Sequence, residues 1–289
     1  MIGIVGGGAL GSALSQALHK QKKKVLIWDK SPRLCSVPDL LSLAERTEVI
    51  FICVPSWANR AVAHELQPDI SKSHVIISLS KGVEPGFVTM DQVLKSELDQ
   101  TEAAYGLLYG PMLADDLERG NPVGATLWVS EQKASKRIVE ALSGLTLRIE
   151  VGRGATEVAL TGVLKNIYAI GLGISAGLKL GSSYQAMLTV QAGVEMAYIL
   201  DYLHADSTAI WQSSGLADLI ATGWSETSIN HEVGVRVAQK KFKLKDQSEG
   251  VLALRELKGH IPIGHLPLLN SISKIVLEHH DPREITKAV

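Results

Sequence analysis

The chain has 289 residues, of which 46% are hydrophobic and 20% charged, and its formal net charge is −1. This length suggests two domains, and the composition is that of an ordinary globular protein with a sizeable core. Because charges of both signs are interspersed, no basic surface is left for nucleic acid or an anionic membrane, and we expect neither as a partner. With two cysteines and no evident leader before the first strand, a reducing cytoplasm is the expected location.

The first half of the chain alternates short apolar runs with amphipathic stretches. Strands are predicted at 1–5, 25–28, 48–54, 74–79, 105–109, 124–129 and 148–151. Helices are predicted at 12–20, 58–65, 88–98 and 133–143. This alternation is typical of an α/β fold, so residues 1–151 are predicted to form a Rossmann domain with a doubly wound parallel sheet.

The second half of the chain, 152–289, is predicted to be an all-α domain. Its helical patterns lie at 156–178, 183–203, 206–222, 229–241, 249–257 and 267–279. The segment 158–180 is apolar enough to resemble a membrane span, but it carries Lys165 and Asn166 near its middle. Charge inside a span is costly, so we expect a buried helix and no membrane insertion.

A glycine motif points to a dinucleotide cofactor. The run from Gly6 through Gly8, Ala9 and Leu10 to Gly11 fits G-x-G-x-x-G and stands between an apolar strand and a helix. In that context the glycines permit a tight turn and a close approach to a pyrophosphate, with helix N–H groups facing the phosphates. The alternative is a plain strand–helix turn.

Asp29, at the end of the second predicted strand, bears on which dinucleotide binds. A carboxylate there can accept hydrogen bonds from the adenosine ribose and would repel the extra phosphate of NADP. Lys30 and Arg33 follow closely and soften that preference. We therefore expect NAD, with NADP as the second choice, and we expect no metal.

Lys165 is the candidate acid or base, because it interrupts an otherwise apolar helix together with Asn166. Burial disfavours an ammonium group, so such a lysine can exchange a proton with an alcohol oxygen near neutral pH. A lysine that extends to the surface is the alternative. Asp218 interrupts another apolar helix, where it could orient the lysine, accept from a substrate hydroxyl, or simply cap the helix.

Pro55 and Lys81 each follow a predicted strand, at the sheet edge where open α/β folds bind ligands. Lys81 there could meet an anion or a carbonyl oxygen. A solvated loop lysine is the alternative.

Four stretches together resemble the NAD-dependent glycerol-3-phosphate dehydrogenase family, and the resemblance covers nearly the whole chain. They are GVLKNIYAIGLGISAGLKLGSSYQAMLTVQAGVEM (162–196), SSGLADLIATGWSETSINHEVG (213–234), the Ser248-Glu249-Gly250-Val251 motif and the Tyr109-Gly110-Pro111 turn. The resemblance implies reversible interconversion of sn-glycerol 3-phosphate and dihydroxyacetone phosphate, feeding phospholipid synthesis.

The resemblance also implies roles for individual residues. Lys165 would donate or accept the proton, with Asn166 and Asp218 beside the reacting triose. Further substrate contacts would come from Lys81, Gly110, Thr222, Ser228 and Asn230. The dinucleotide would be held by the glycine motif and Asp29, together with Pro55, Lys81, Ala114 and Glu249. By fold-level analogy we expect a homodimer formed through the helical domain.

Three positions depart from the family pattern. Ile229 stands where the family has an arginine that helps to hold the substrate phosphate, Met112 replaces a serine, and Gln191 replaces another arginine. A lost bidentate contact would cost on the order of 2–4 kcal/mol of binding. Three hypotheses stay open: the glycerol-3-phosphate dehydrogenase itself, a related dehydrogenase of another small hydroxy or keto compound, and a non-catalytic dinucleotide sensor.

Overall fold

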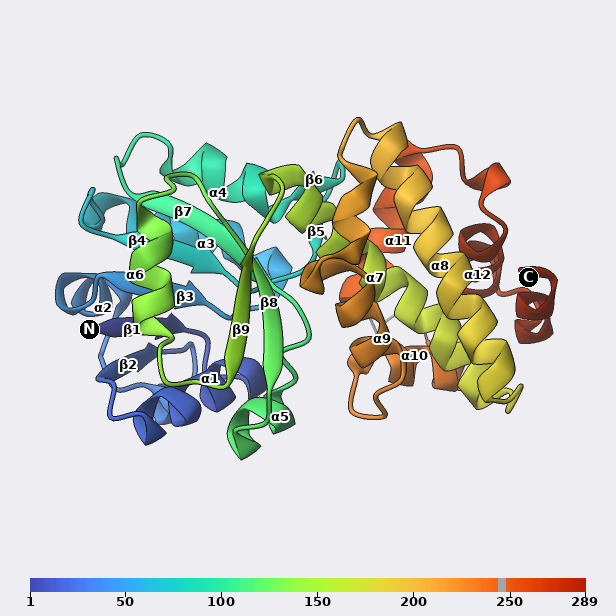
Figure 1. The fold of residues 1–289 in the computed structure, drawn as a ribbon, viewed down its shortest axis with the longest axis horizontal. Helices are drawn as coiled ribbons and strands as arrows, with labels where there is room; N and C mark the ends of the chain where they lie inside the picture. The colour runs from blue at the N-terminus through green and yellow to red at the C-terminus, as the bar shows by residue number, and fades with distance from the viewer. Residues whose placement is uncertain (244–247) are drawn as a thin grey trace. The chain divides into compact units, whose positions relative to one another are not determined.

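A computed structural model describes residues 1–243 and 248–289 (Figure 1). The chain divides into two compact units, one of Met1–Ser80 with Thr89–Ala159 and one of Lys81–Val88 with Leu160–Val289. The predicted division between residues 151 and 152 stays a prediction. The contacts differ from it by placing 152–159 in the first unit and Lys81–Val88 in the second.

A seven-stranded sheet in the order β2-β1-β3-β4-β7-β8-β9 forms the centre of the first unit. Its strands are β1 (Ile2–Val5), β2 (Val25–Trp28), β3 (Val49–Ile52), β4 (Val75–Ser78), β7 (Ala104–Tyr109), β8 (Val123–Val129) and β9 (Leu147–Val151). The predicted parallel sheet is confirmed from β2 to β7. By contrast, β8 runs antiparallel to β7, and β9 is parallel to β8.

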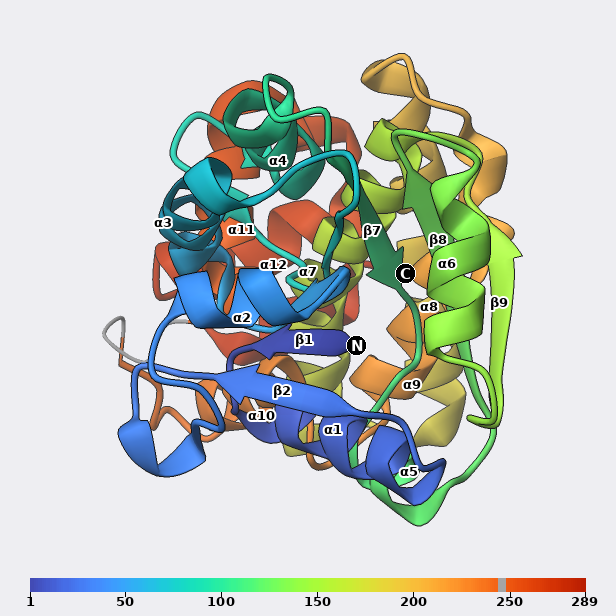
Figure 2. The same cartoon turned by 90° about the vertical axis from the view of Figure 1, so that its left-hand side faces the viewer.

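Helices cover both faces of this sheet. They are α1 (Ala9–Lys20), α2 (Leu40–Arg46), α3 (Ser56–Leu66), α4 (Met90–Leu98), α5 (Ala114–Arg119) and α6 (Ala134–Ala141). Figure 2 shows α1 and α5 on one side of β1 and β2, and α2 on the other. Alternate strand residues such as Ile4 and Phe51 share a core cluster with Leu14 of α1 and Ile138 of α6. All residues of β1, β3 and β4 are buried, so side chains on both faces of the sheet are covered, as a doubly wound fold requires.

The second unit is helical. Its α-helices are α7 (Ala155–Gly177), α8 (Ser182–Tyr202), α9 (Asp218–Gly223), α10 (Ile229–Ala238), α11 (Glu249–His260) and α12 (Pro267–Leu277). Among the described residues, α7 is the one helix long and apolar enough to cross a membrane, and its apolar window is buried throughout. The predicted buried helix is therefore found, at the centre of this unit's core.

The single helix predicted for 206–222 is wrong. The structure has a 3-10 turn η3 (Ser207–Trp211), a π-type turn η4 (Ser213–Ala217) and then α9. The break falls at Gly215, whose φ of −95° and ψ of −111° are not helical and where a Cβ would overlap the carbonyl oxygen of Ile210. The apolar period continued through this glycine, so the sequence pattern alone did not reveal the bend.

A short hairpin of β5 (Val83–Glu84) and β6 (Val88–Thr89) was not predicted. Val83 belongs to the core cluster of the helical unit, and β5 packs against α11. Lys81–Val88 is therefore part of the second unit, although both of its neighbours in sequence belong to the first.

Candidate functional site

The glycine turn between β1 and α1 has the geometry of a dinucleotide site. Gly6 has a φ of +102°, which favours glycine, and a Cβ at Gly11 would overlap the carbonyl oxygen of Gly6. Among the described residues, none lies within 4 Å of the place where a Cβ of Gly8 would be. The first turn of α1 has no side-chain cap, which leaves its N–H groups to meet an anion such as a pyrophosphate.

Asp29 is joined to this turn. Its Oδ2 accepts a hydrogen bond of 2.7 Å from the Gly7 N–H, and its Oδ1 accepts one of 2.7 Å from the Ser31 N–H. It also lines an open hollow of about 870 Å³ with Trp28 and Lys30, within the first unit. The carboxylate therefore stands where it can accept from a ribose, and these residues fit an adenosine dinucleotide.

Three other predicted ligands lie in the first unit. Pro55 precedes α3 directly, after the Cys53–Val54 segment that Gly6 packs against. Ala114 is the first residue of α5, which packs on α1. Gly110 approaches β8 so closely that a Cβ would overlap the carbonyl oxygen of Gly124. This packing alone accounts for a glycine at position 110, and no contact with a ligand is needed to explain it.

In the second unit, Lys165 of α7 is buried, with 6% of its surface exposed. Its Nζ donates a hydrogen bond of 2.7 Å to the Thr222 hydroxyl and lies 3.2 Å from Oδ1 of Asp218. Asp218 and Thr222 stand one turn apart on α9, and the hydroxyl also donates to Asp218 Oδ1 at 3.2 Å. The lysine thus does not extend to the surface.

Lys81 approaches the same carboxylate from the other side. Its Nζ lies 2.6 Å from Oδ2 of Asp218, and its side chain is 16% exposed. Asp218 itself is 1% exposed. Two ammonium groups therefore share one buried carboxylate, so the cluster is one positive charge in excess whenever both lysines are protonated.

This arrangement explains the proton affinity of Lys165. Burial lowers the pKa of Lys165 from its ordinary 10.5 to about 8, and the positive charge of Lys81 acts in the same direction while Asp218 opposes both. An amine with such a pKa exchanges protons readily near neutral pH. The cluster can therefore hold a small anion or carbonyl compound and transfer a proton to or from it.

Asn166 and Asn230, predicted at the reacting substrate, contact each other. Asn230 Nδ2 donates to Asn166 Oδ1 at 2.9 Å, and Asn166 Nδ2 donates to the carbonyl oxygen of Lys81 at 2.8 Å. Asn166 is 4% exposed and Asn230 is 8% exposed. Of the remaining predicted residues, Ser228 caps α10 through the His231 N–H, and Glu249 is the first residue of α11.

The three departures from the family pattern have different surroundings. Ile229 begins α10 and is 68% exposed. Met112 is buried in the core of the first unit, and Gln191 donates to Glu195 Oε1 at 3.0 Å. Met112 therefore has a packing role of its own, and Gln191 has a hydrogen-bonding role of its own. The exposed Ile229 has neither role among the described residues.

Sequence reasoning missed two buried polar groups in the second unit. Glu195 accepts from the Tyr168 hydroxyl and from the backbone N–H groups of Leu268 and Leu269 at the start of α12. Thr161 donates to Ser214 at 2.9 Å. An acidic residue inside the apolar run of α8 was an available signal for Glu195, of the same kind that singled out Asp218.

Comparison with known proteins adds the family. Residues 31–135 match the model of the NAD-dependent glycerol-3-phosphate dehydrogenase N-terminus, and residues 155–287 match that of its C-terminus. Residues 4–37 match an NAD(P)-binding Rossmann-like domain. The glycerol-3-phosphate dehydrogenase [NAD(P)+] of Pseudomonas savastanoi pv. phaseolicola is 28% identical over 100% of this chain and 93% of its own. That of Acinetobacter baylyi is 26% identical over 99% of this chain and 88% of its own.

Two solved structures of glycerol-3-phosphate dehydrogenases have the same fold as this chain. Glycerol-3-phosphate dehydrogenase from Coxiella burnetii superimposes with a TM-score of 0.86 at 26% identity, covering 99% of this chain and 97% of that one. The Saccharomyces cerevisiae enzyme, at 17% identity, shares the fold with a TM-score of 0.80 over 99% of this chain and 98% of that one.

The Rossmann turn, the buried lysine cluster and these relatives define the chain as an NAD(P)-dependent dehydrogenase. It belongs to the NAD-dependent glycerol-3-phosphate dehydrogenase family, whose two domain models together span most of its length.

Proposed function

We propose that the protein interconverts sn-glycerol 3-phosphate and dihydroxyacetone phosphate, with Lys165 as the proton donor and acceptor. The observation that carries this proposal is the buried Lys165, which shares the Asp218 carboxylate with Lys81. Relatives that align over the whole chain are named for this reaction.

The glycine motif and Asp29 would hold a nicotinamide dinucleotide, which when bound would supply or accept the hydride for the substrate carbon that changes between ketone and alcohol. In reduction, the Lys165 ammonium gives a proton to the carbonyl oxygen as the C–H bond forms, and the alcohol results. In oxidation, the neutral amine takes the hydroxyl proton. Asp218 and Thr222 hold the Nζ in one orientation, because each contacts it directly.

Lys81 would meet the anionic or carbonyl oxygen of the substrate. The excess positive charge of the cluster favours a phosphate ester over a neutral triose. For the dinucleotide, we infer that the backbone of the glycine motif holds the pyrophosphate and that Asp29 accepts from the adenosine ribose, with Pro55, Ala114 and Glu249 as further contacts. A cytoplasmic location also stays a prediction.

The direct test follows NADH and NADPH absorbance with dihydroxyacetone phosphate as substrate. We expect turnover in the wild type and a loss of about 100- to 10,000-fold in kcat for K165M, since a positioned acid contributes that much. K258M is the matched control, because Lys258 lies on the surface in an ion pair with Glu278 and should leave kcat unchanged. Absence of turnover at saturating substrate with both cofactors would overturn the proposal.

Ile229 favours a second candidate, a related dehydrogenase of a different small hydroxy or keto compound. An exposed isoleucine at the start of α10 offers a phosphate neither charge nor a side-chain hydrogen bond. Under this candidate, I229R should raise kcat/KM for dihydroxyacetone phosphate by about tenfold or more. Efficient turnover of that substrate by the wild type would remove it.

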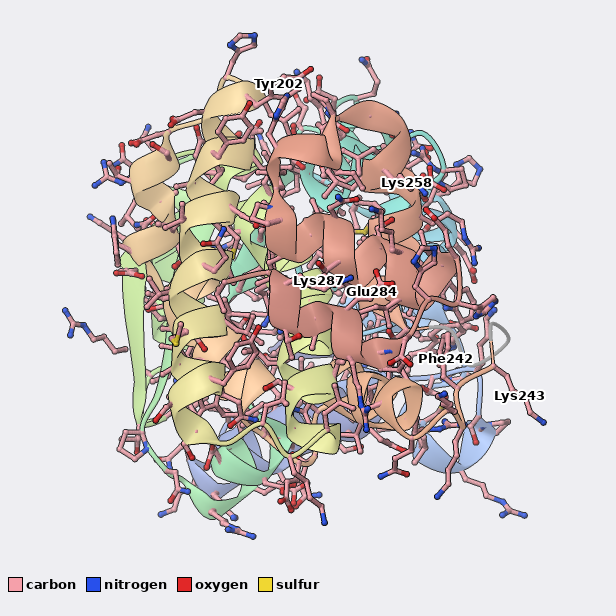
Figure 3. All side chains as sticks on the ribbon, turned by 90° about the vertical axis from the view of Figure 1, so that its right-hand side faces the viewer. Tyr202, Phe242, Lys243, Lys258, Glu284 and Lys287 are labelled. Carbon is pink, nitrogen blue, oxygen red and sulfur yellow. The ribbon has the colours of Figure 1, made fainter. Side chains whose placement is uncertain are left out.

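We further infer that the protein is a homodimer that pairs through α8. The outward face of this helix carries Met187, Val190, Val194, Tyr198 and Tyr202, each about half exposed. Among the outward residues of the helix's second half, Asp201 is the charged one. In Figure 3, by contrast, Lys258 of α11 and Glu284 and Lys287 of the C-terminal η6 (Pro282–Lys287) give that side of the unit charged groups.

The size of the α8 face favours a second copy as its partner. The stripe from Met187 to Tyr202 is about 22 Å long, and Trp224 borders it through a hydrogen bond to Thr189. Aromatic side chains have about 150–250 Å² each, and Tyr198, Tyr202, Trp211 and Trp224 are each about half exposed or more. Together they therefore offer roughly half of the ~800 Å² that each partner of a stable complex buries. Because one straight stripe can pack antiparallel against itself, a two-fold dimer needs no second surface.

A further inference from the structure

Two polar contacts, one helical turn apart on α7, join that helix to the segment that carries Asp218. In the first, Thr161 Oγ1 donates to Ser214 Oγ at 2.9 Å, and both residues are fully buried. In the second, Nζ of Lys165 lies 3.2 Å from Oδ1 of Asp218. Thr161 precedes Lys165 by four residues, so the two side chains lie on the same face of α7. Ser214 likewise precedes Asp218 by four residues, and all four residues belong to the second unit.

The segment that carries Asp218 depends on other elements for its position. Asp218 is the first residue of α9, which has six residues, and a helix this short is not stable without tertiary contacts. Just before α9 the chain bends at Gly215, where a Cβ would overlap the Ile210 carbonyl oxygen. Ser214 is the residue before this bend. Its hydrogen bond to Thr161 therefore attaches the chain to α7 at the point where the chain turns into α9.

Asp218 tolerates little displacement, because its carboxylate has several partners. Besides Lys165, its Oδ1 accepts from the Thr222 hydroxyl at 3.2 Å, and its Oδ2 lies 2.6 Å from Lys81 Nζ. Asp218 is 1% exposed, so solvent offers little replacement for a partner that is lost. A shift of the start of α9 by about 1 Å would take Oδ1 out of hydrogen-bonding distance of the Lys165 ammonium.

We propose that Thr161 and Ser214 are positioning residues, which fix the start of α9 on α7 and so hold Asp218 against Lys165. This inference rests on the proposed function, in which Lys165 is the proton donor and acceptor. The two hydroxyls act through Asp218, since both residues are fully buried and stand one turn away from the reacting cluster. The family resemblance implied no role for either residue.

The test compares variants that differ in one or two buried hydroxyls. T161V replaces the hydroxyl of Thr161 with a methyl group of similar size, and T161S keeps the hydroxyl. The double variant T161V/S214A removes both partners, so that neither hydroxyl of the pair stays buried without the other. S175A is the matched control, because Ser175 is also fully buried on α7 and its hydroxyl makes no hydrogen bond with any described residue.

The first readout is the titration of Lys165, which does not depend on turnover. Protein labelled with ¹³C at the lysine Cε is titrated by NMR without substrate or cofactor, and the Lys165 signal is assigned from its absence in K165M. Burial lowers the pKa of Lys165 and Asp218 raises it, so displacement of the carboxylate lowers the midpoint. We expect a decrease of about half a pH unit or more in T161V and T161V/S214A, and the wild-type midpoint in T161S and S175A. An unchanged midpoint in T161V/S214A, or an equal decrease in S175A, would overturn the positioning role.

The second readout is the reduction of dihydroxyacetone phosphate, followed by NADH and NADPH absorbance. We expect kcat of T161V to fall about tenfold while KM stays within about twofold of the wild type, since the orientation of the acid is disturbed and substrate contacts are kept. The pH at which kcat falls should move to lower pH together with the NMR midpoint. A rise in KM with kcat unchanged would contradict the inference. A wild type without dehydrogenase activity would instead count against the proposed function, and the titration would still decide this inference.

Discussion

Lys165 depends on a neighbour that is distant in sequence. Burial accounts for most of the decrease in its pKa to about 8, and the charge of Lys81 adds to it. The two lysines face the same carboxylate from opposite oxygens, so a change at one alters the proton affinity of the other. At the scale of single residues, this coupling should be visible in the pH dependence of kcat.

The direction of the pH dependence follows from the protonation state that each reaction needs. Reduction requires the Lys165 ammonium, so kcat should fall as pH rises through about 8, and oxidation requires the neutral amine, so kcat should rise there. In K81M the Lys165 pKa is expected to rise, which moves both midpoints to higher pH by about half a pH unit or more.

Initial rates from pH 6 to 10 in both directions measure these midpoints, with K258M as the matched control. Identical midpoints for K81M and wild type would show that Lys81 does not act on Lys165.

Glu195 shows how one buried carboxylate can join three helices. Its Oε1 accepts from Gln191 Nε2 and the Leu268 N–H, and its Oε2 accepts from the Tyr168 hydroxyl and the Leu269 N–H. The N–H groups at the start of α12 have no partner within their own helix, so Glu195 on α8 caps α12 from outside. Burial, and then the charge of Glu195, raises the pKa of Tyr168 well above its ordinary value.

Replacing Glu195 with glutamine should destabilise the helical unit. The new NH₂ group would face two donors, and a buried donor without a partner costs about 1–3 kcal/mol, so we expect E195Q to lower the free energy of unfolding by about 2–4 kcal/mol. E278Q is the control, since Glu278 is an exposed partner of Lys258 and such surface ion pairs add little to stability. Urea unfolding followed by circular dichroism compares the two, and equal stability would contradict the role given to Glu195.

The first turn of α11 gives a second prediction at the scale of elements. G250A places a methyl group against the Asn166 carbonyl and should cost about 1–3 kcal/mol of stability. G259A, near the end of the same helix, meets no atom of residues 1–243 or 248–289 within 4 Å and should stabilise by about 0.5–1 kcal/mol, as alanine does in helices.

Thermal unfolding of both variants checks the sign of each change. If G250A were as stable as G259A, the close approach between α11 and α7 would not be needed for folding.

At the scale of the molecule, sequence patterns predicted what depends on local periodicity. The strands from β1 to β7 and the glycine turn were predictable because apolar runs and glycine spacing are local signals. The antiparallel direction of β8 was not, because it depends on how the connection from Gly110 folds back. The bend at Gly215 was also missed, since the apolar period runs through it.

In the candidate site, too, the residues marked by local sequence signals could be predicted, whereas the contacts that depend on packing could not. Lys165 and Asp218 were found because each is a charged residue in an apolar stretch. The pairing of Lys81 with Asp218 joins residues 137 positions apart and requires Lys81–Val88 to pack into the helical unit. The mutual hydrogen bond of Asn166 and Asn230 likewise depends on how α7 and α10 pack, and the spacing of residues does not report it.

The exposed stripe on α8 leads to a prediction about assembly. An apolar face of this length on a single soluble copy is unfavourable, and pairing two copies removes it from water. We expect the wild type to be a dimer at micromolar concentration by light scattering after size exclusion. V194E places a charge near the middle of the stripe, where a two-fold axis would bring it close to its own copy, and should give a monomer.

V139E is the matched control, because Val139 is a half-exposed valine on α6, which belongs to the first unit and not to the helical unit that carries α8. It should leave the dimer intact. A wild type that is monomeric, or a V194E protein that stays dimeric, would show that α8 is not the interface. If the dimer also supports catalysis, V194E should be less active than V139E at the same protein concentration, and only V139E should lose activity on dilution, since the population of a dimer depends on protein concentration.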